Sequence, residues 1–101
     1  MSYGLSKYAL NQLQGIIDDY AERGSDERGN QIAHAILDTI DLLVTQPLMG
    51  RTEKNLTFQK ETVRSFTHPP HYRIYYIFDG TDIYVVSIFD VRQHPKKLRL
   101  R

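Results

Sequence analysis

The chain has 101 residues, no cysteine and a formal net charge of +1, so we expect a single domain, residues 1–101, with a core of modest size. The absence of cysteine excludes disulfides and thiolate metal sites. No apolar run is long enough to span a membrane, and the opening "MSYGLSKYAL" lacks the long apolar stretch of a secretory signal. We therefore expect a cytoplasmic protein.

The charges are unevenly distributed along the chain. Residues 1–45 carry three basic and seven acidic side chains, a balance of −4, whereas residues 46–101 carry ten and five, a balance of +5. One interpretation is an ordinary solvated surface. The other is a positive side that faces an anionic partner, either a nucleic acid or an acidic protein segment.

Two amphipathic helices are indicated in the first half. "SYGL" is typical of a short edge strand, and Ser6 is suited to cap the helix that follows. Gly24 is placed to end that helix, and the turn "SDERGN" offers Ser25 or Asp26 as the next cap. Gln46-Pro47 stops the second helix, so we expect an antiparallel helical hairpin. Its apolar stripes are Leu10, Leu13, Ile16, Ile17 and Tyr20, then Ile32, Ala33, Ile36, Ile40, Leu43 and Val44.

In the second half, apolar and polar residues alternate with a period of two. Residues 46–61 show little periodicity and are interpreted as a connection, whereas "TVRSF", "HYRIYYIF" and "DIYVVSIF" are typical of strands. Asp79-Gly80-Thr81 predicts a tight turn. The last two strands are apolar on both faces, so we expect both faces to be covered. The helices would cover one face. The other would be covered by the tail, by a second copy of the chain or by a partner protein. The expected fold is α+β, in the order β-α-α-β-β-β with a basic tail.

Several kinds of catalytic site have no support in the sequence. The four histidines lack the spacing of a metal-ligand set. No serine lies in a Gly-x-Ser-x-Gly turn, and no glycine-rich loop could hold a phosphate. We expect neither a metal nor a cofactor.

Basic residues on or beside the strands are the remaining candidates. Arg64 and Arg73 lie within strands, and Arg92 and His94 follow the last strand, with Lys96 and Lys97 behind them. Arginine binds phosphates through a fork of donors, and histidine transfers protons near neutral pH, so the set could cleave RNA. Alternatively, the strand arginines pair with neighbours and the tail is solvated. Strand tyrosines such as Tyr75 favour sheet packing over base stacking.

The whole pattern resembles the ParE/RelE superfamily of type II toxins. "LSKYALNQLQGIIDDY" is similar to the family's helical opening, although Gln12 replaces a common aspartate. "LLVTQPLMGR" is similar to its L-x-x-x-P-x-x-G-R join. "VRSF", "HYRIYYIF" and "IYVVSIFDVRQHP" are similar to its strands.

The resemblance implies a helical hairpin packed on a curved antiparallel sheet. It also implies a cognate ParD-like antitoxin that neutralises the toxin by direct binding. The surface implied for the target or the antitoxin is formed by Arg64, Arg73, Tyr75, Arg92, Lys96 and Lys97.

The resemblance leaves two molecular targets open. RelE-like members cut mRNA on the ribosome, and Arg64 and Arg92 match arginine positions of those nucleases, with His94 as a possible acid–base residue. However, Leu98 stands where RelE has a tyrosine, and Lys54 stands alone where RelE has two lysines. ParE-like members resemble the RelE-like members in fold but inhibit DNA gyrase and are not known as nucleases. The helical opening and the "PLMGR" join favour a ParE-like gyrase inhibitor over an endoribonuclease.

Overall fold

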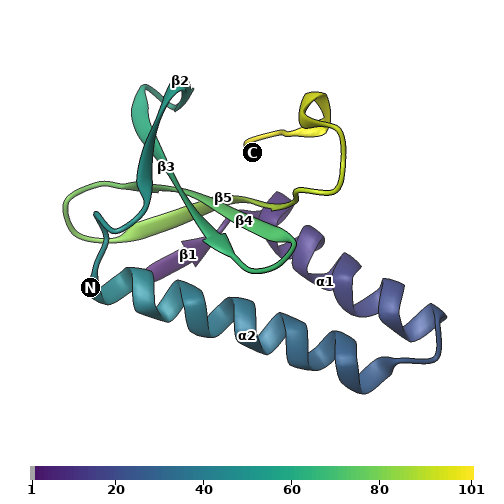
Figure 1. The fold of residues 1–101 in the computed structure, drawn as a ribbon. Helices are drawn as coiled ribbons and strands as arrows, with labels where there is room; N and C mark the ends of the chain where they lie inside the picture. The colour runs from purple at the N-terminus through teal and green to yellow at the C-terminus, as the bar shows by residue number, and fades with distance from the viewer. Residues whose placement is uncertain (1) are drawn as a thin grey trace.

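Two antiparallel helices pack against one face of a five-stranded sheet (Figure 1). The computed structural model describes residues 2–101. No helix in these residues combines the length and apolar character that a membrane span requires. The elements are β1 (Tyr3–Leu5), α1 (Lys7–Glu22), α2 (Asp26–Thr45), β2 (Arg51–Phe58), β3 (Glu61–His68), β4 (Tyr72–Phe78), β5 (Ile83–Asp90) and the short 3-10 helix η1 (Pro95–Lys97).

The helix ends follow the signals in the sequence. Ser6 caps α1, because its hydroxyl accepts a hydrogen bond from the backbone N–H of Ala9 at 3.0 Å. Gly24 follows α1 with a φ of +75°, the left-handed conformation that glycine adopts at helix ends. Ser25 occupies the N-cap position of α2, although its side chain makes no capping bond. Gln46 ends α2 directly before Pro47.

The sheet has the strand order β1-β5-β4-β3-β2. β1 runs parallel to β5, and the other neighbours are antiparallel, so the sheet is mixed where we expected an antiparallel one. The turn at Asp79 forms as expected, since its carboxylate accepts hydrogen bonds from the N–H groups of Thr81 and Asp82, both at 2.8 Å.

The interpretation of residues 46–61 as a connection was wrong. Residues 51–58 form β2, and a two-residue turn, Gln59-Lys60, joins it to β3. The element order is therefore β-α-α-β-β-β-β. β2 escaped notice because its side chains are mostly exposed and its turn lacks the Asn-Gly or Asp-Gly signal of a tight hairpin.

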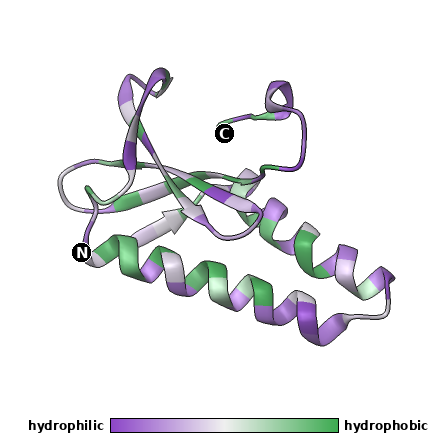
Figure 2. Ribbon diagram, in the orientation of Figure 1, coloured by the Kyte–Doolittle hydropathy of each residue, from purple (hydrophilic) through white to green (hydrophobic). Residues whose placement is uncertain are grey.

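The main core lies between the helices and the sheet. Apolar and polar bands alternate along both helices (Figure 2), and the apolar ones meet β4 and β5. Leu10 is an exception, since it is 52% exposed and Ala9 is buried in its place. The buried cluster comprises Ala9, Leu13, Ala33, Ile36, Ile40, Leu43, Tyr72, Ile74, Tyr76, Ile83, Val85 and Ile88.

Candidate functional site

A second apolar cluster lies on the face of the sheet that points away from the helices. We call this the second face. Its buried members are Val63, Tyr75, Ile77, Val86 and Phe89. Leu56 and Phe58 of β2 pack against it from one side, and Leu98 and Leu100 of the C-terminal tail, residues 91–101, pack from the other. The tail was one of the three coverings that the sequence left open.

The tail is fixed to the sheet at an irregularity in β5. The register of β4 with β5 shifts between the pairs Tyr75–Ser87 and Tyr76–Val85, which leaves Val86 as a β-bulge. The Val86 carbonyl accepts a hydrogen bond from the Arg101 N–H at 3.0 Å. In the extended segment "LRLR", the leucines pack inward and the arginines face outward.

Gln12 of α1 contacts the two residues that follow the bulge, from the helical side. Its side-chain carbonyl accepts the Ile88 N–H at 2.6 Å, and its amide nitrogen donates to the Ser87 hydroxyl at 3.4 Å. Sequence reasoning noted Gln12 only as a departure from a family pattern. The signal that could have identified it is a long amide side chain on an otherwise inward-facing part of a helix.

Arg92 is held in an ion pair at the end of β5. Its Nε and Nη2 atoms donate to the two carboxylate oxygens of Asp90 at 3.0 and 2.8 Å. The hydrogen bonds from Arg92 hold the pKa of Asp90 below its ordinary value, and Asp90 raises the pKa of Arg92. The Arg92 side chain is nevertheless half exposed, so a partner can still reach it.

His94 caps the short helix η1. Its Nδ1 accepts the backbone N–H of Lys96 at 3.0 Å. That nitrogen is therefore occupied by a structural hydrogen bond. Pro95 is the first residue of the helical turn, a position that proline favours. Lys96 and Lys97 lie on η1 with their side chains exposed.

Arg64 lies on the opposite face of the sheet from the tail. Its cross-strand neighbour is Tyr76, a member of the helix-side core, and directly paired residues share a face. Its Nη1 donates to the carbonyls of Gly50 at 2.9 Å and Leu48 at 3.4 Å. Arg64 therefore holds the join between α2 and β2.

Gly50 belongs to that join for a steric reason. A Cβ atom at this position would lie 2.5 Å from the Tyr76 hydroxyl and 2.9 Å from the Ser65 carbonyl. The Tyr76 hydroxyl accepts the Gly50 N–H at 2.9 Å and donates to the Pro47 carbonyl at 2.8 Å. The "PLMGR" segment therefore passes from the helical layer to the sheet in close contact with β3 and β4, and only glycine fits at position 50.

Arg73 and Tyr75 lie on the second face, as the period of β4 requires. Arg73 donates through Nη2 to the Thr67 hydroxyl at 3.3 Å, and its buried Nε has no partner among residues 2–101. Tyr75 is 6% exposed, so it packs in the sheet and offers no open ring to a base.

Glu53 of β2 lies close to this arginine. Its carboxylate accepts hydrogen bonds from Ser65 at 2.6 Å and Arg51 at 2.8 Å. Burial raises the pKa of Glu53, but these two hydrogen bonds and the nearby Arg73 charge outweigh it and hold the pKa below its ordinary value. Glu53 is thus charged, and it was missed because β2 was interpreted as a connection.

The structure separates the residues that the nuclease interpretation required to converge. Arg64 serves the α2–β2 join on the helix side, whereas Arg92 and His94 are engaged in the turn after β5. Arg73, Tyr75, Lys96 and Lys97 do belong to the second face and its rim. The arrangement is a buried apolar cluster with basic side chains at its border.

The comparisons with known proteins agree with this architecture. Residues 3–95 match the family model described as the ParE toxin of type II toxin–antitoxin system, parDE. Among solved structures, the chain is similar to one titled "Chromosomal ParDE TA system from P. aeruginosa", with a TM-score of 0.71 and 21% identity over 90% of this chain and 96% of that one. No curated protein sequence matches the chain significantly. The family match extends over nearly the whole sequence, and the chain therefore belongs to the ParE toxin family of type II toxin–antitoxin systems.

Proposed function

We propose that this protein is a toxin that inhibits DNA gyrase in the cytoplasm and that a cognate ParD-like antitoxin neutralises it by direct binding. Family membership supports the toxin role, and the similar solved structure is of a ParDE system. The observation that carries the choice of target is that Arg64 is bound to the α2–β2 join, whereas Arg92 is paired with Asp90 at the end of β5 and His94 caps η1. General acid–base cleavage of RNA needs its groups around one scissile bond.

The second face is the surface we assign to the antitoxin. An amphipathic acidic segment would place apolar side chains near Leu98 and Leu100 and carboxylates near Lys96 and Lys97. The buried Nε of Arg73, which has no partner within residues 2–101, is a donor that such a carboxylate could satisfy.

Gyrase inhibition is tested by a supercoiling assay with the purified chain. We expect loss of supercoiling or accumulation of cleaved DNA, and reversal on addition of the antitoxin. An absence of any effect from protein that still arrests growth would contradict the proposal.

The endoribonuclease alternative predicts a different result. Translating extracts would show new mRNA ends at codon positions, and both His94→Ala and Arg92→Ala would abolish growth arrest. We expect no new mRNA ends, and growth arrest that persists in His94→Ala.

A further inference from the structure

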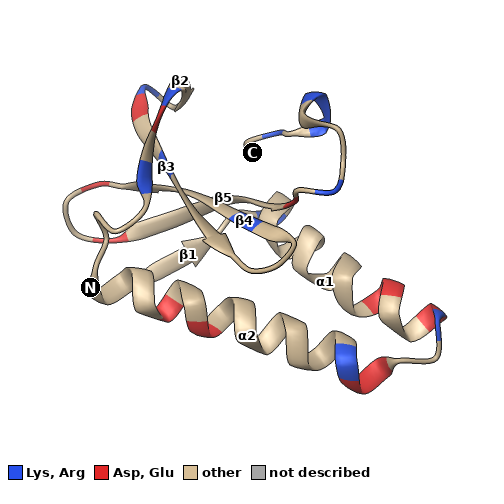
Figure 3. Ribbon diagram, in the orientation of Figure 1, with Lys and Arg blue, Asp and Glu red and all other residues tan. Residues whose placement is uncertain are grey.

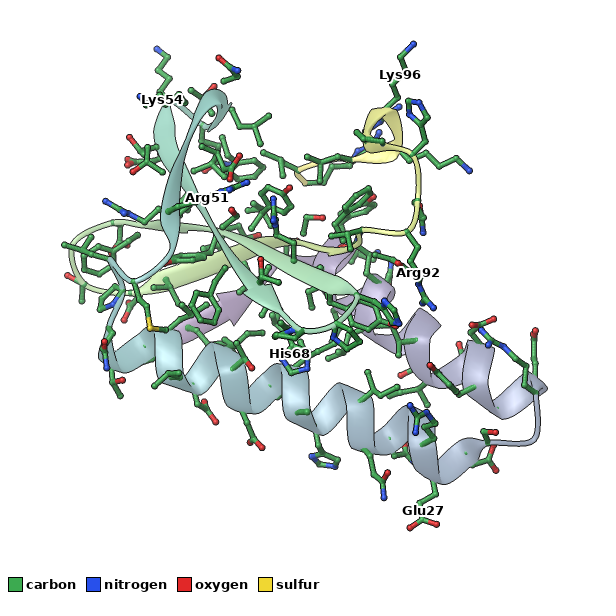
Figure 4. The ribbon with its side chains drawn as sticks, in the orientation of Figure 1. Glu27, Arg51, Lys54, His68, Arg92 and Lys96 are labelled. Carbon is green, nitrogen blue, oxygen red and sulfur yellow. The ribbon has the colours of Figure 1, made fainter. Side chains whose placement is uncertain are left out.

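Lysines gather at two places on the border of the second face. We call Lys54 and Lys60 the hairpin lobe, since they belong to β2 and its turn, and Lys96 and Lys97 the tail lobe. Figure 3 shows basic residues at both places. In Figure 4, Lys54 and Lys96 project in the same direction, away from the helices, from opposite sides of this face.

These four lysines are free to meet a partner. Within residues 2–101 the ion pairs are Arg23–Asp19, Arg51–Glu53 and Arg92–Asp90, and none includes a lysine. All four lysine side chains are exposed. The tail carries five basic residues and no acidic residue.

Both lobes are held on ordered backbone. Leu98, Leu100 and the hydrogen bond from Arg101 to Val86 hold the tail lobe. In the hairpin lobe, Gln59 and Lys60 adopt φ angles of +51° and +67°, which side chains other than glycine rarely accept. Positive φ at both positions is the geometry of a two-residue hairpin turn between the paired residues Phe58 and Glu61, so this turn fixes the backbone that carries Lys60.

The opposite side of the molecule carries the other sign of charge. Residues 1–45, which form β1 and the helical hairpin, have a balance of −4. Acidic residues are coloured at several places along α1 and α2 in Figure 3. Because one side is negative and the other positive, the electrostatic field orients the second face toward an approaching polyanion.

The second face suits a duplex better than single-stranded nucleic acid. Single strands bind by stacking bases on exposed aromatic rings, whereas Tyr75 and Phe89 are only 6% and 7% exposed. Lysines on fixed supports fit the dense phosphate backbone of a double helix. We propose that the hairpin and tail lobes bind the phosphate backbone of duplex DNA without sequence preference. The role of this contact in growth arrest rests on the proposed function, because gyrase holds duplex DNA while it acts.

The experiment measures fluorescence anisotropy of a short labelled duplex of mixed sequence, titrated with the purified chain at several salt concentrations. Wild-type protein is expected to bind with an affinity that falls steeply with salt. Lys96→Gln/Lys97→Gln and Lys54→Gln/Lys60→Gln are each expected to weaken binding by about tenfold or more and to reduce the salt slope by about 0.9 for each lost phosphate contact. Unchanged circular dichroism and melting temperature show that these exposed substitutions preserve the fold.

The matched control is Arg23→Gln/Arg28→Gln, which removes the same charge from the acidic helical layer and is expected to bind the duplex as wild type does. The proposal is overturned if wild type does not bind at low salt, or if the control loses as much affinity as the lobe variants. It is also overturned if single-stranded RNA or an acidic peptide binds through the lobes while the duplex does not. A supercoiling assay on the same proteins distinguishes the two proposals, because gyrase inhibition without duplex binding leaves the proposed function standing.

Discussion

At the scale of single residues, Tyr76 connects β4 to the α2–β2 join through one hydroxyl group. The side chain is fully buried, and its hydroxyl both accepts the Gly50 N–H and donates to the Pro47 carbonyl. Burial raises the pKa of Tyr76, so the hydroxyl keeps the proton that it donates. Arg64 adds a hydrogen bond to the Gly50 carbonyl. The join between the helical and sheet layers therefore depends on side chains that sequence reasoning had assigned to packing or to catalysis.

Removing this hydroxyl should be costly. Tyr76→Phe leaves a buried N–H and a buried carbonyl without their partner, and we expect the free energy of unfolding to fall by about 1–3 kcal/mol. Urea denaturation followed by circular dichroism measures the change. Tyr75→Phe is the control, since no hydrogen bond of the Tyr75 hydroxyl is found among residues 2–101, and equal losses in the two variants would contradict the assignment.

His68 predicts a pH dependence of stability. Its Nδ1 lies 2.8 Å from the Thr39 hydroxyl, which itself donates to the Ala35 carbonyl, so the ring holds the end of β3 on α2. Burial lowers the pKa of His68 below its ordinary 6.5. At a pH above 6.5 the ring is neutral in both the folded and the unfolded chain, and burying it costs nothing in charge. As the pH falls through 6.5 toward the lower folded-state pKa, the unfolded chain takes up the proton first, so stability is lost.

The test compares chemical denaturation at pH 7.5 and pH 5. His68→Gln should show a smaller loss of stability over this interval than wild type. His34→Gln, on the exposed side of α2, should lose as much as wild type does. Identical pH profiles for wild type and His68→Gln would show that His68 does not titrate against folding.

At the scale of elements, the β2–β3 hairpin is the part that the sequence concealed. Its turn residues occupy the left-handed region, where a residue other than glycine costs roughly 1–2 kcal/mol. Lys60→Gly should relieve this strain and raise the free energy of unfolding by about 1 kcal/mol, which is a rise in melting temperature of about 4–8 °C for a domain of this size.

Lys60→Ala is the matched control for the hairpin prediction. It removes the same charge but retains the strained φ angle, so its melting temperature should stay near that of wild type. A rise with alanine as large as with glycine would assign the effect to charge.

The other elements were predictable to different degrees. The periods of α2, β4 and β5 predicted their buried faces, because each packs against a continuous apolar layer. Leu10 was assigned to the core wrongly, since Ala9 and Leu13 form the buried face of α1 and Leu10 is exposed beside them. Arg64 and Arg73 both lie in strands, but only the register shows that they occupy opposite faces. Sequence period alone cannot orient one strand relative to the next.

At the scale of the whole molecule, two apolar clusters share β4 and β5. The helix-side cluster has no contribution from the tail, whereas the cluster on the second face is completed by Leu98 and Leu100. Deletion of residues 92–101 should therefore leave a domain that unfolds cooperatively, at lower stability, and should abolish growth arrest on expression. Loss of cooperative unfolding would instead make the tail part of the folding unit.

The bulge at Val86 has a consequence for how the two sides of the molecule communicate. Arg101 binds the bulge from above while Gln12 binds the next two residues from below. A partner that displaces the tail would break the hydrogen bond from Arg101 to Val86 and alter the backbone of β5 next to Gln12. It would do so without contacting the helices. The side-chain amide resonances of Gln12 in a nitrogen-labelled sample would thus act as an internal reporter of whether the tail is seated or displaced.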